Sequence, residues 1–262
     1  MRMRAPASFG PAWGAEVVSS NIVGYQKLTL QPGMNMIGGL FQGVGTGLSL
    51  SLNGQFSDDA TVSTSGSGAD DADTILTFDA ATQNYDIPYY FYFDPDDDDE
   101  YNNKWYNAGD ASGEPTGDTL AGGEAGWYRY RGNSSVQITM AGEVPTNAIY
   151  QVTLYPGMNF VANPYPAPIP LNGTTFTVEG ITSGAGADDA DTILTFDATT
   201  QNYDIPYYFY FDPDDDDEYN NKWYNAGDAS GEPTADTLAP GVGFWYRFRG
   251  TGTATLKFAK PY

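Results

Sequence analysis

The chain has 262 residues, and its hydrophobic share of 40% with 15% aromatics is enough to build a folded core. A net charge of -23 repels nucleic acid and anionic membrane surfaces, and it favours bound cations or a salty surrounding. Cysteine and histidine are both absent, which excludes disulfides, thiol nucleophiles, soft-metal sites and imidazole acid–base chemistry. Many glycines, prolines and tyrosines without helical periodicity predict an all-β chain rich in turns.

Residues 1–15 are interpreted as a leader or truncated signal peptide. The basic start Met1-Arg2-Met3-Arg4 and the small-residue pattern around Ala12 to Ala15 resemble the two ends of a secretory signal, with a short apolar middle. An ordinary leader is the alternative. The first interpretation predicts a secreted or cell-surface protein. Nothing in the sequence approaches the ~20 consecutive apolar residues of a transmembrane helix.

An internal repeat organises the rest of the chain. Residues 69–116 recur as residues 187–234 with a single difference, Ala81 against Thr199. The match continues more loosely on both sides, so we predict two tandem modules, residues 16–142 and 143–262. The near-identity has two explanations: both copies present the same surface to the same partner, or the duplication is recent. The diverged flanks favour the first.

Short strands separated by turn residues predict a small β-sandwich or open barrel in each copy. A turn at Pro32-Gly33 separates the first two strands, and Asn53-Gly54 ends the third. The fourth and fifth form a predicted hairpin. In the last, Val136, Ile138 and Met140 share one face. The predicted strands are residues 25–30, 34–37, 48–52, 74–79, 85–93, 126–131 and 136–140.

The order of these pieces resembles a β-rich module, often tandem, of secreted and surface proteins of environmental bacteria. Its pattern is a "GWNLI"-like strand, a central Trp, an "L-x-PG-x-GYW" strand and a final strand. Copy 1 matches it at residues 33–37, Trp105, residues 120–128 and 136–140, and copy 2 at residues 157–161, Trp223 and residues 238–245. Met34 and Met158 stand where the family has Trp. The resemblance implies a non-enzymatic surface or appendage protein and supplies no catalytic residues.

An acidic cluster, which the family lacks, follows the aromatic strand in each copy. Six carboxylates fall within seven residues, and their mutual repulsion is relieved when a hard cation binds. We therefore predict calcium sites, with a solvated, solubilising charge run as the alternative. Asp70, Asp71 and Asp73 are further oxygen donors. The predicted ligands are Asp94, Asp96, Asp97, Asp98, Asp99 and Glu100 in copy 1, and Asp212, Asp214, Asp215, Asp216, Asp217 and Glu218 in copy 2.

Tyrosines of the aromatic strand are candidate contact residues. Because alternate strand residues face opposite sides, Tyr90 and Tyr92 of copy 1 lie opposite Phe91, as Tyr208 and Tyr210 do in copy 2. One face should fill the core, and the other should meet another protein copy or stack on a glycan. A core with tyrosine hydroxyls at its rim is the alternative.

Four arginines form two pairs in a chain with few basic residues. Arg129 and Arg131 in copy 1 and Arg247 and Arg249 in copy 2 are spaced two apart, beside Trp127 and Trp245. We expect them to pair with the acidic clusters, within the chain or across a contact between copies. Ordinary surface pairs are the alternative.

These features together predict a non-enzymatic extracellular structural protein that self-associates head to tail into a filament or surface layer. The carboxylates are contiguous on loops, so they do not flank a cleft as glycoside hydrolysis requires. A calcium-dependent carbohydrate-binding or adhesive module is the alternative function. A monomeric acidic protein of a salt-loving organism is a third.

Overall fold

The computed structural model describes residues 22–56, 63–97, 100–215 and 218–262. The leader predicted at residues 1–15 lies outside the described residues. In copy 1 the elements are β1 (Val23–Leu30), β2 (Gly33–Gly38), α1 (Leu52–Phe56), β3 (Thr74–Asp79), β4 (Asn84–Tyr85), β5 (Tyr89–Tyr92), β6 (Lys104–Asn107), β7 (Ala125–Tyr130) and β8 (Val136–Glu143).

Copy 2 repeats this plan with extra short strands. Its elements are β9 (Ile149–Leu154), β10 (Gly157–Ala162), β11 (Ile169–Pro170), β12 (Phe176–Glu179), β13 (Thr192–Leu194), β14 (Phe196–Asp197), β15 (Asn202–Tyr203), β16 (Tyr207–Tyr210), β17 (Lys222–Asn225), β18 (Thr237–Leu238), β19 (Gly243–Phe248) and β20 (Ala254–Ala259). The predicted all-β fold is confirmed, and the described sheets are open and antiparallel.

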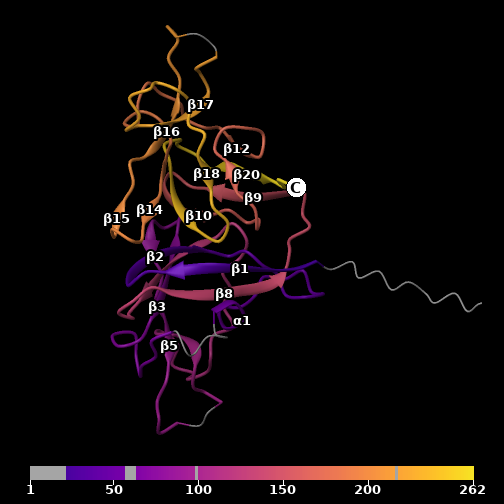
Figure 1. Cartoon of the computed structure of the whole chain (residues 1–262), viewed down its shortest axis with the longest axis vertical. Helices are drawn as coiled ribbons and strands as arrows, with labels where there is room; N and C mark the ends of the chain where they lie inside the picture. The colour runs from indigo at the N-terminus through magenta and orange to yellow at the C-terminus, as the bar shows by residue number, and fades with distance from the viewer. Residues whose placement is uncertain (1–21, 57–62, 98–99, 216–217) are drawn as a thin grey trace, which may run out of the picture.

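Each copy is built from two layers of strands. The main sheet of copy 1 has the order β2-β7-β3-β5-β6, and the equivalent sheet of copy 2 is β10-β19-β13-β16-β17. The smaller layer is the pair β1-β8 in copy 1 and the sheet β12-β20-β9 in copy 2. Figure 1 shows these layers with copy 2 above copy 1.

The core of each copy lies between its two layers, because alternate residues of every strand turn inward. In copy 1, Ile75, Phe91 and Trp105 of the main sheet meet Ile138 and Met140 of β8. The predicted inward face of β8 is therefore confirmed. Copy 2 uses the equivalent residues, including Ile193, Trp223 and Leu256.

Some predicted local details are wrong. The strands on either side of the predicted turn at Pro32-Gly33 belong to different layers, because β1 pairs with β8 and β2 pairs with β7. In the predicted strand of residues 48–52 only Ser49 and Ser51 form isolated bridges, and the helix α1 begins at Leu52. The predicted hairpin exists as β3–β4, but the aromatic strand breaks before Pro88 and resumes as β5.

The two copies pack through the outer faces of their main sheets around an approximate two-fold axis. Phe78 of copy 1 lies edge-on to Trp245 at 4.9 Å between ring centroids, and Phe196 of copy 2 lies edge-on to Trp127 at 4.9 Å. Phe160 lies between the two tryptophans, stacked on Trp245 at 4.2 Å and 5.5 Å from Trp127. An aromatic cluster thus joins the copies.

Hydrogen bonds between the copies obey the same two-fold relation. Gln83 at the β3–β4 turn accepts from Met158 N at 2.8 Å and donates to Met158 O at 2.8 Å. Gln201 accepts from Met34 N at 2.7 Å and donates to Met34 O at 3.0 Å. Each glutamine amide therefore pairs with the other copy's edge strand as a neighbouring strand would.

The contact between Gln201 and the strand of Met34 requires glycine at position 33. Its φ is 101°, which is unfavourable for residues with a side chain, and a Cβ there would lie 2.4 Å from Oε1 of Gln201. Gly157 has φ 102° and stands in the same relation to Gln83. The repeated Pro-Gly of the sequence is thus a requirement of the interface between copies.

The two-fold arrangement places corresponding ends of the copies far apart. In Figure 1 the loop after β5 lies at the lower end of the molecule and the β16–β17 loop at the upper end. The described residues contain no helix that is both long and apolar enough to span a membrane.

Candidate functional site

We define the distal tip of a copy as its aromatic strand, the following acidic loop and the next strand: residues 89–107 in copy 1 and 207–225 in copy 2. A buried asparagine organises each acidic loop. Asn102 accepts from Asp94 N at 2.7 Å and donates to Asp94 O at 2.9 Å. Asn220 repeats both bonds with Asp212 at 2.7 and 2.9 Å. Each loop thus closes on itself, and among its described carboxylates Asp96, Asp97 and Glu100 of copy 1 are exposed.

A tyrosine cup occupies the outer face of the tip in copy 1, opposite the buried Phe91. Tyr90 and Tyr106 lie directly across from each other on β5 and β6, with ring centroids 6.0 Å apart, and Tyr92 lies 5.1 Å from Tyr106. Tyr101 and Asp97 complete a hollow of about 250 Å³. Tyr90 and Tyr92 on the predicted outward face of the strand are therefore half-buried.

Copy 2 reproduces the ring geometry of this cup. Tyr208 and Tyr224 are 6.0 Å apart, and Tyr210 is 5.1 Å from Tyr224. Tyr106 and Tyr224 are fixed because their hydroxyls donate to the backbone oxygens of Tyr101 and Tyr219, each at 2.8 Å. The molecule therefore presents the same aromatic surface twice.

One carboxylate of each acidic loop accepts a hydrogen bond from a tyrosine of the cup. Tyr92 donates to Asp97, and this hydrogen bond raises the pKa of the Tyr92 phenol, since the carboxylate opposes a second negative charge. Tyr210 and Asp215 form the same pair. Burial, followed by nearby acidic groups, raises the pKa of Tyr106 to about 12.

We predict that Asp97→Asn lowers the pKa of Tyr92 towards its ordinary value of 10.0, because the neutral amide neither repels the phenolate nor holds its proton as strongly. Asp215→Asn is the matched change for Tyr210. Absorbance-detected tyrosine titration should show one additional phenol ionising at lower pH in each variant and two in the double variant. Identical titration curves for wild type and double variant would contradict the pairing.

The predicted calcium ligands do not form a ready-made site in the part of the chain that is described. No group of three or more acidic side chains close enough to hold a metal occurs there. Asp94 accepts from Asp96 N at 2.9 Å within its own loop. Asp98, Asp99, Asp216 and Asp217 lie outside the described residues, so calcium binding stays a prediction.

The arginine pairs divide into two roles. Arg131 and Arg249 are half-buried: Arg131 donates to the backbone oxygens of Ala72 and Ala69, the second at 2.9 Å. Arg129 and Arg247 are exposed. Within the described residues the only ion pair joins Lys257 to Glu179, so intrachain pairing of these arginines with acidic clusters is not observed there. Contact with another copy stays a prediction for Arg129 and Arg247.

Asp73, predicted as a further calcium donor, is instead a buried structural residue, and so is Asp191. The Asp73 carboxylate accepts from Arg131 N at 2.7 Å, Thr64 N at 3.0 Å and the Tyr128 hydroxyl at 3.1 Å. Burial raises the pKa of both aspartates. Sequence reasoning missed this role, although "Ala-Asp-Thr-Ile" opening a buried strand distinguishes Asp73 from exposed Asp70 and Asp71.

Comparison with known proteins finds no matching family model, no matching curated protein and no matching solved structure.

Proposed function

We propose that this protein is a non-enzymatic extracellular structural protein whose two distal tips join successive subunits into a filament or surface layer. The observation that supports this most is the pair of equivalent tyrosine–acid tips at opposite ends of one chain (Figure 1). A rigid unit with one contact surface at each end is bivalent, and bivalent units form open chains.

The contact between copies is already satisfied within one subunit, so polymer growth requires another surface. A two-fold contact is self-complementary and closes once both partners are in place. Its aromatic cluster and its Gln83 and Gln201 bonds are used inside the chain. The subunits of the proposed filament or surface layer therefore meet at their tips.

The near-identity of the repeated segment also supports contact at the tips. Part of the segment, including Phe78 and Gln83, serves the two-fold contact, which demands the same residues from both copies. The tip residues make their described ring contacts within their own copy. A common external partner would explain why the tip residues are also identical in the two copies.

Calcium would join tip to tip in this proposal. Two acidic loops repel each other at short range, at about 1 kcal/mol per pair of charges even in water. A hard cation with six to eight oxygen ligands can take some from each loop. The exposed Asp96, Asp97 and Glu100, with their copy 2 equivalents, are available for this.

We predict that millimolar calcium makes the scattering mass of dilute protein grow and that a chelator reverses the growth. Sodium chloride at matched ionic strength is the control, because it screens charges without bridging them. Static light scattering measures both. A monomeric mass throughout the calcium titration would overturn tip-to-tip assembly, and folding that depends on bulk salt alone would favour a monomeric acidic protein.

Carbohydrate binding or adhesion is a second candidate, favoured by the shape of the cup. Its tyrosine rings surround a hollow of about 250 Å³ with Asp97 at the edge. Aromatic faces and a carboxylate acceptor suit a sugar ring. Glycan-array binding that disappears in Tyr90→Ala with Tyr208→Ala, while light scattering stays monomeric, would favour this function over assembly.

A further inference from the structure

The tyrosine cup of each distal tip combines aromatic rings with nearby negative charge. In copy 1 four tyrosines and one carboxylate line the hollow of about 250 Å³: Tyr90, Tyr92, Tyr101, Tyr106 and Asp97. Tyr90 lies directly across from Tyr106 on the neighbouring strand, so both rings belong to the outer face of the main sheet. The faces of aromatic rings carry partial negative charge and attract cations.

The rings of the cup meet as a corner. Tyr90 and Tyr106 are inclined to each other by only 33°, with their ring centroids 6.0 Å apart. Tyr92 stands at 76° to Tyr90 and at 60° to Tyr106, so its ring forms a wall beside the other two. A cation attracts a ring when it lies within about 6 Å of the ring centroid. One cation in this corner therefore contacts more than one ring.

Carboxylates act on the same corner. Asp97 accepts a hydrogen bond from the Tyr92 hydroxyl at the edge of the cup. Burial raises the pKa of Tyr106, and the negative charges of Glu114 and Asp97 raise this pKa further. Both carboxylates are exposed, and neither forms an ion pair with a basic side chain in the part of the chain that is described. The negative charge around the cup thus has no internal positive partner there.

Copy 2 repeats this arrangement with equivalent residues. Tyr208 and Tyr224 are inclined by 35° at 6.0 Å, and Tyr210 stands at 80° to Tyr208. Tyr210 donates to Asp215, and after burial the charge of Glu232 contributes most to the raised pKa of Tyr224. We therefore expect two equivalent sites in each chain.

The cup suits a cation without N–H groups. Its hydroxyls already donate within the protein, from Tyr92 to Asp97 and from Tyr106 to the backbone oxygen of Tyr101 at 2.8 Å. A primary ammonium group has three N–H donors that lose water on binding, and ring faces are weak acceptors for them. A quaternary ammonium group has no such donors, and its methyl groups can pack against the rings.

We propose that each tyrosine cup binds a small quaternary ammonium cation, with its methyl groups against the rings of Tyr90, Tyr92 and Tyr106 and its charge beside Asp97. A phosphate or carboxylate next to the ammonium group would be repelled by Asp97 and Glu114, so a cation without a neighbouring anion binds best. The site shares the cup with the proposed assembly but does not depend on it, because each cup lies within a single subunit.

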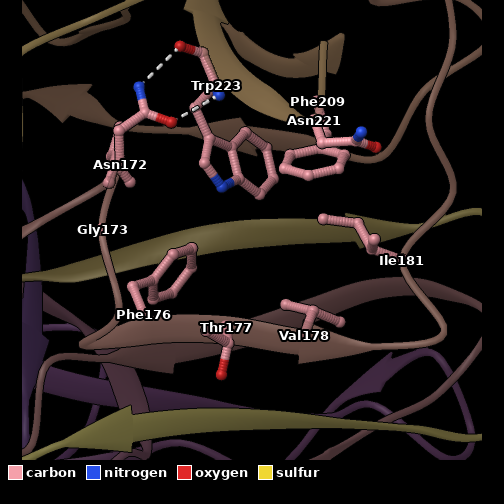
Figure 2. Close-up of a pocket in the computed structure, with 10 residues that line it drawn as sticks. Asn172, Gly173, Phe176, Thr177, Val178, Ile181, Phe209, Asn221 and Trp223 are labelled. Carbon is pink, nitrogen blue, oxygen red and sulfur yellow. Dashed lines mark hydrogen bonds between the residues drawn. The ribbon is translucent and has the colours of Figure 1, made fainter. Parts of the chain in front are cut away.

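A hollow beside Trp223 in copy 2 is an internal control. Figure 2 shows Phe209 and Trp223 on one side of it and Phe176 on the other, and its volume is about 200 Å³. This hollow also has aromatic rings, but none of the residues that line it carries a charge. A cation that requires a carboxylate should enter the cups and leave this hollow empty.

The test is a titration of the full chain with choline chloride, in a chelator so that calcium-dependent assembly does not interfere. The protein carries carbon-13 in its tyrosine rings and nitrogen-15 in its indoles for nuclear magnetic resonance. Peaks of the cup tyrosines should shift and saturate, while the Trp223 indole peak stays in place. No saturable tyrosine shift, or an equal shift of Trp223, would overturn the proposal without affecting the assembly test.

Two further probes separate charge from shape. In neohexyl alcohol a carbon replaces the nitrogen of choline, so the molecule keeps its shape and loses its charge. It should bind about tenfold more weakly than choline. Phosphocholine carries the same ammonium group beside a phosphate and should also bind more weakly, which distinguishes a free cation from a lipid headgroup. Equal binding of choline and neohexyl alcohol would contradict the site.

Two double variants with the same change in net charge make the titration specific. Asp97→Asn with Asp215→Asn removes the carboxylates that line the cups, and it should weaken choline binding about fivefold while leaving neohexyl alcohol unaffected. Asp96→Asn with Asp214→Asn is the matched control, because these exposed aspartates lie in the same loops but do not hydrogen-bond to the cup tyrosines. Equal weakening in both variants would show that the charge of the whole loop, and not the cup, attracts the cation.

Discussion

Replacing Trp245 with alanine is expected to lower the free energy of unfolding by about 3–5 kcal/mol, the usual loss for a large aromatic residue removed from a packed core. Trp245 is 4% exposed although it lies on the outer face of its sheet, because copy 1 covers it. Its removal separates Phe78 from Phe160 and leaves a cavity between the copies. Chemical denaturation followed by circular dichroism measures the loss.

The two-fold contact leads us to expect a further effect, in which Trp127 and Trp245 depend on each other. Trp127→Ala should also be strongly destabilising, and the double variant should lose less than the sum, because both rings contact Phe160. Tyr25→Ala is the control: Tyr25 is 72% exposed, so its change should stay within about 0.5 kcal/mol. Additive losses, or a Trp245→Ala protein as stable as the control, would contradict the described interface.

Replacing Asp73 with asparagine is expected to lower the free energy of unfolding by roughly 2–4 kcal/mol, although the two side chains have nearly the same shape. Three donors converge on the Asp73 carboxylate, from Thr64, Arg131 and Tyr128. The asparagine amide has only one acceptor oxygen, and its NH₂ group would face at least one of these three donors without forming a hydrogen bond. Asp71→Asn is the matched control, because Asp71 is exposed two residues away.

The pH dependence of this difference has a definite sign. Burial raises the pKa of Asp73 above its ordinary value of 3.8, so the folded protein binds this proton more tightly than the unfolded chain does. The contribution of Asp73 to stability therefore increases as pH falls from the raised pKa towards 3.8. Denaturation across acidic pH should show the gap between wild type and Asp73→Asn widening as pH falls. If the stability difference between wild type and Asp73→Asn narrows as pH falls, the Asp73 carboxyl binds its proton less tightly in the folded protein than in the unfolded chain, which would contradict this prediction.

The fold was accessible from the sequence because alternation and turn residues are local signals. The inward face of β8 follows from Val136, Ile138 and Met140 alone. Strand pairing is not local: β1 and β2 are neighbours in sequence, yet they belong to different layers. The start of α1 at Leu52 was missed because a five-residue helix has too few turns to show periodicity.

The tips were only partly predictable, because they too depend on strand pairing, which is not a local signal. Alternation correctly separates Tyr90 and Tyr92 from buried Phe91. The third ring of the cup, Tyr106, comes from β6 through strand pairing, which the sequence does not specify. The sequence places the arginine pairs beside Trp127 and Trp245, but it does not show that the approximate two-fold axis buries these tryptophans between the copies. No single-copy pattern reveals such an axis.

The proposed joining of subunits through two equivalent tips is tested most directly by disabling one tip at a time. Tyr90→Ala with Tyr92→Ala removes the cup of copy 1, and Tyr208→Ala with Tyr210→Ala removes that of copy 2. Electron microscopy and mass measurement in calcium should show open chains for the wild type, pairs for either one-tip variant, and single molecules when both tips are changed. Wild-type chain lengths after both tips are changed would contradict the account.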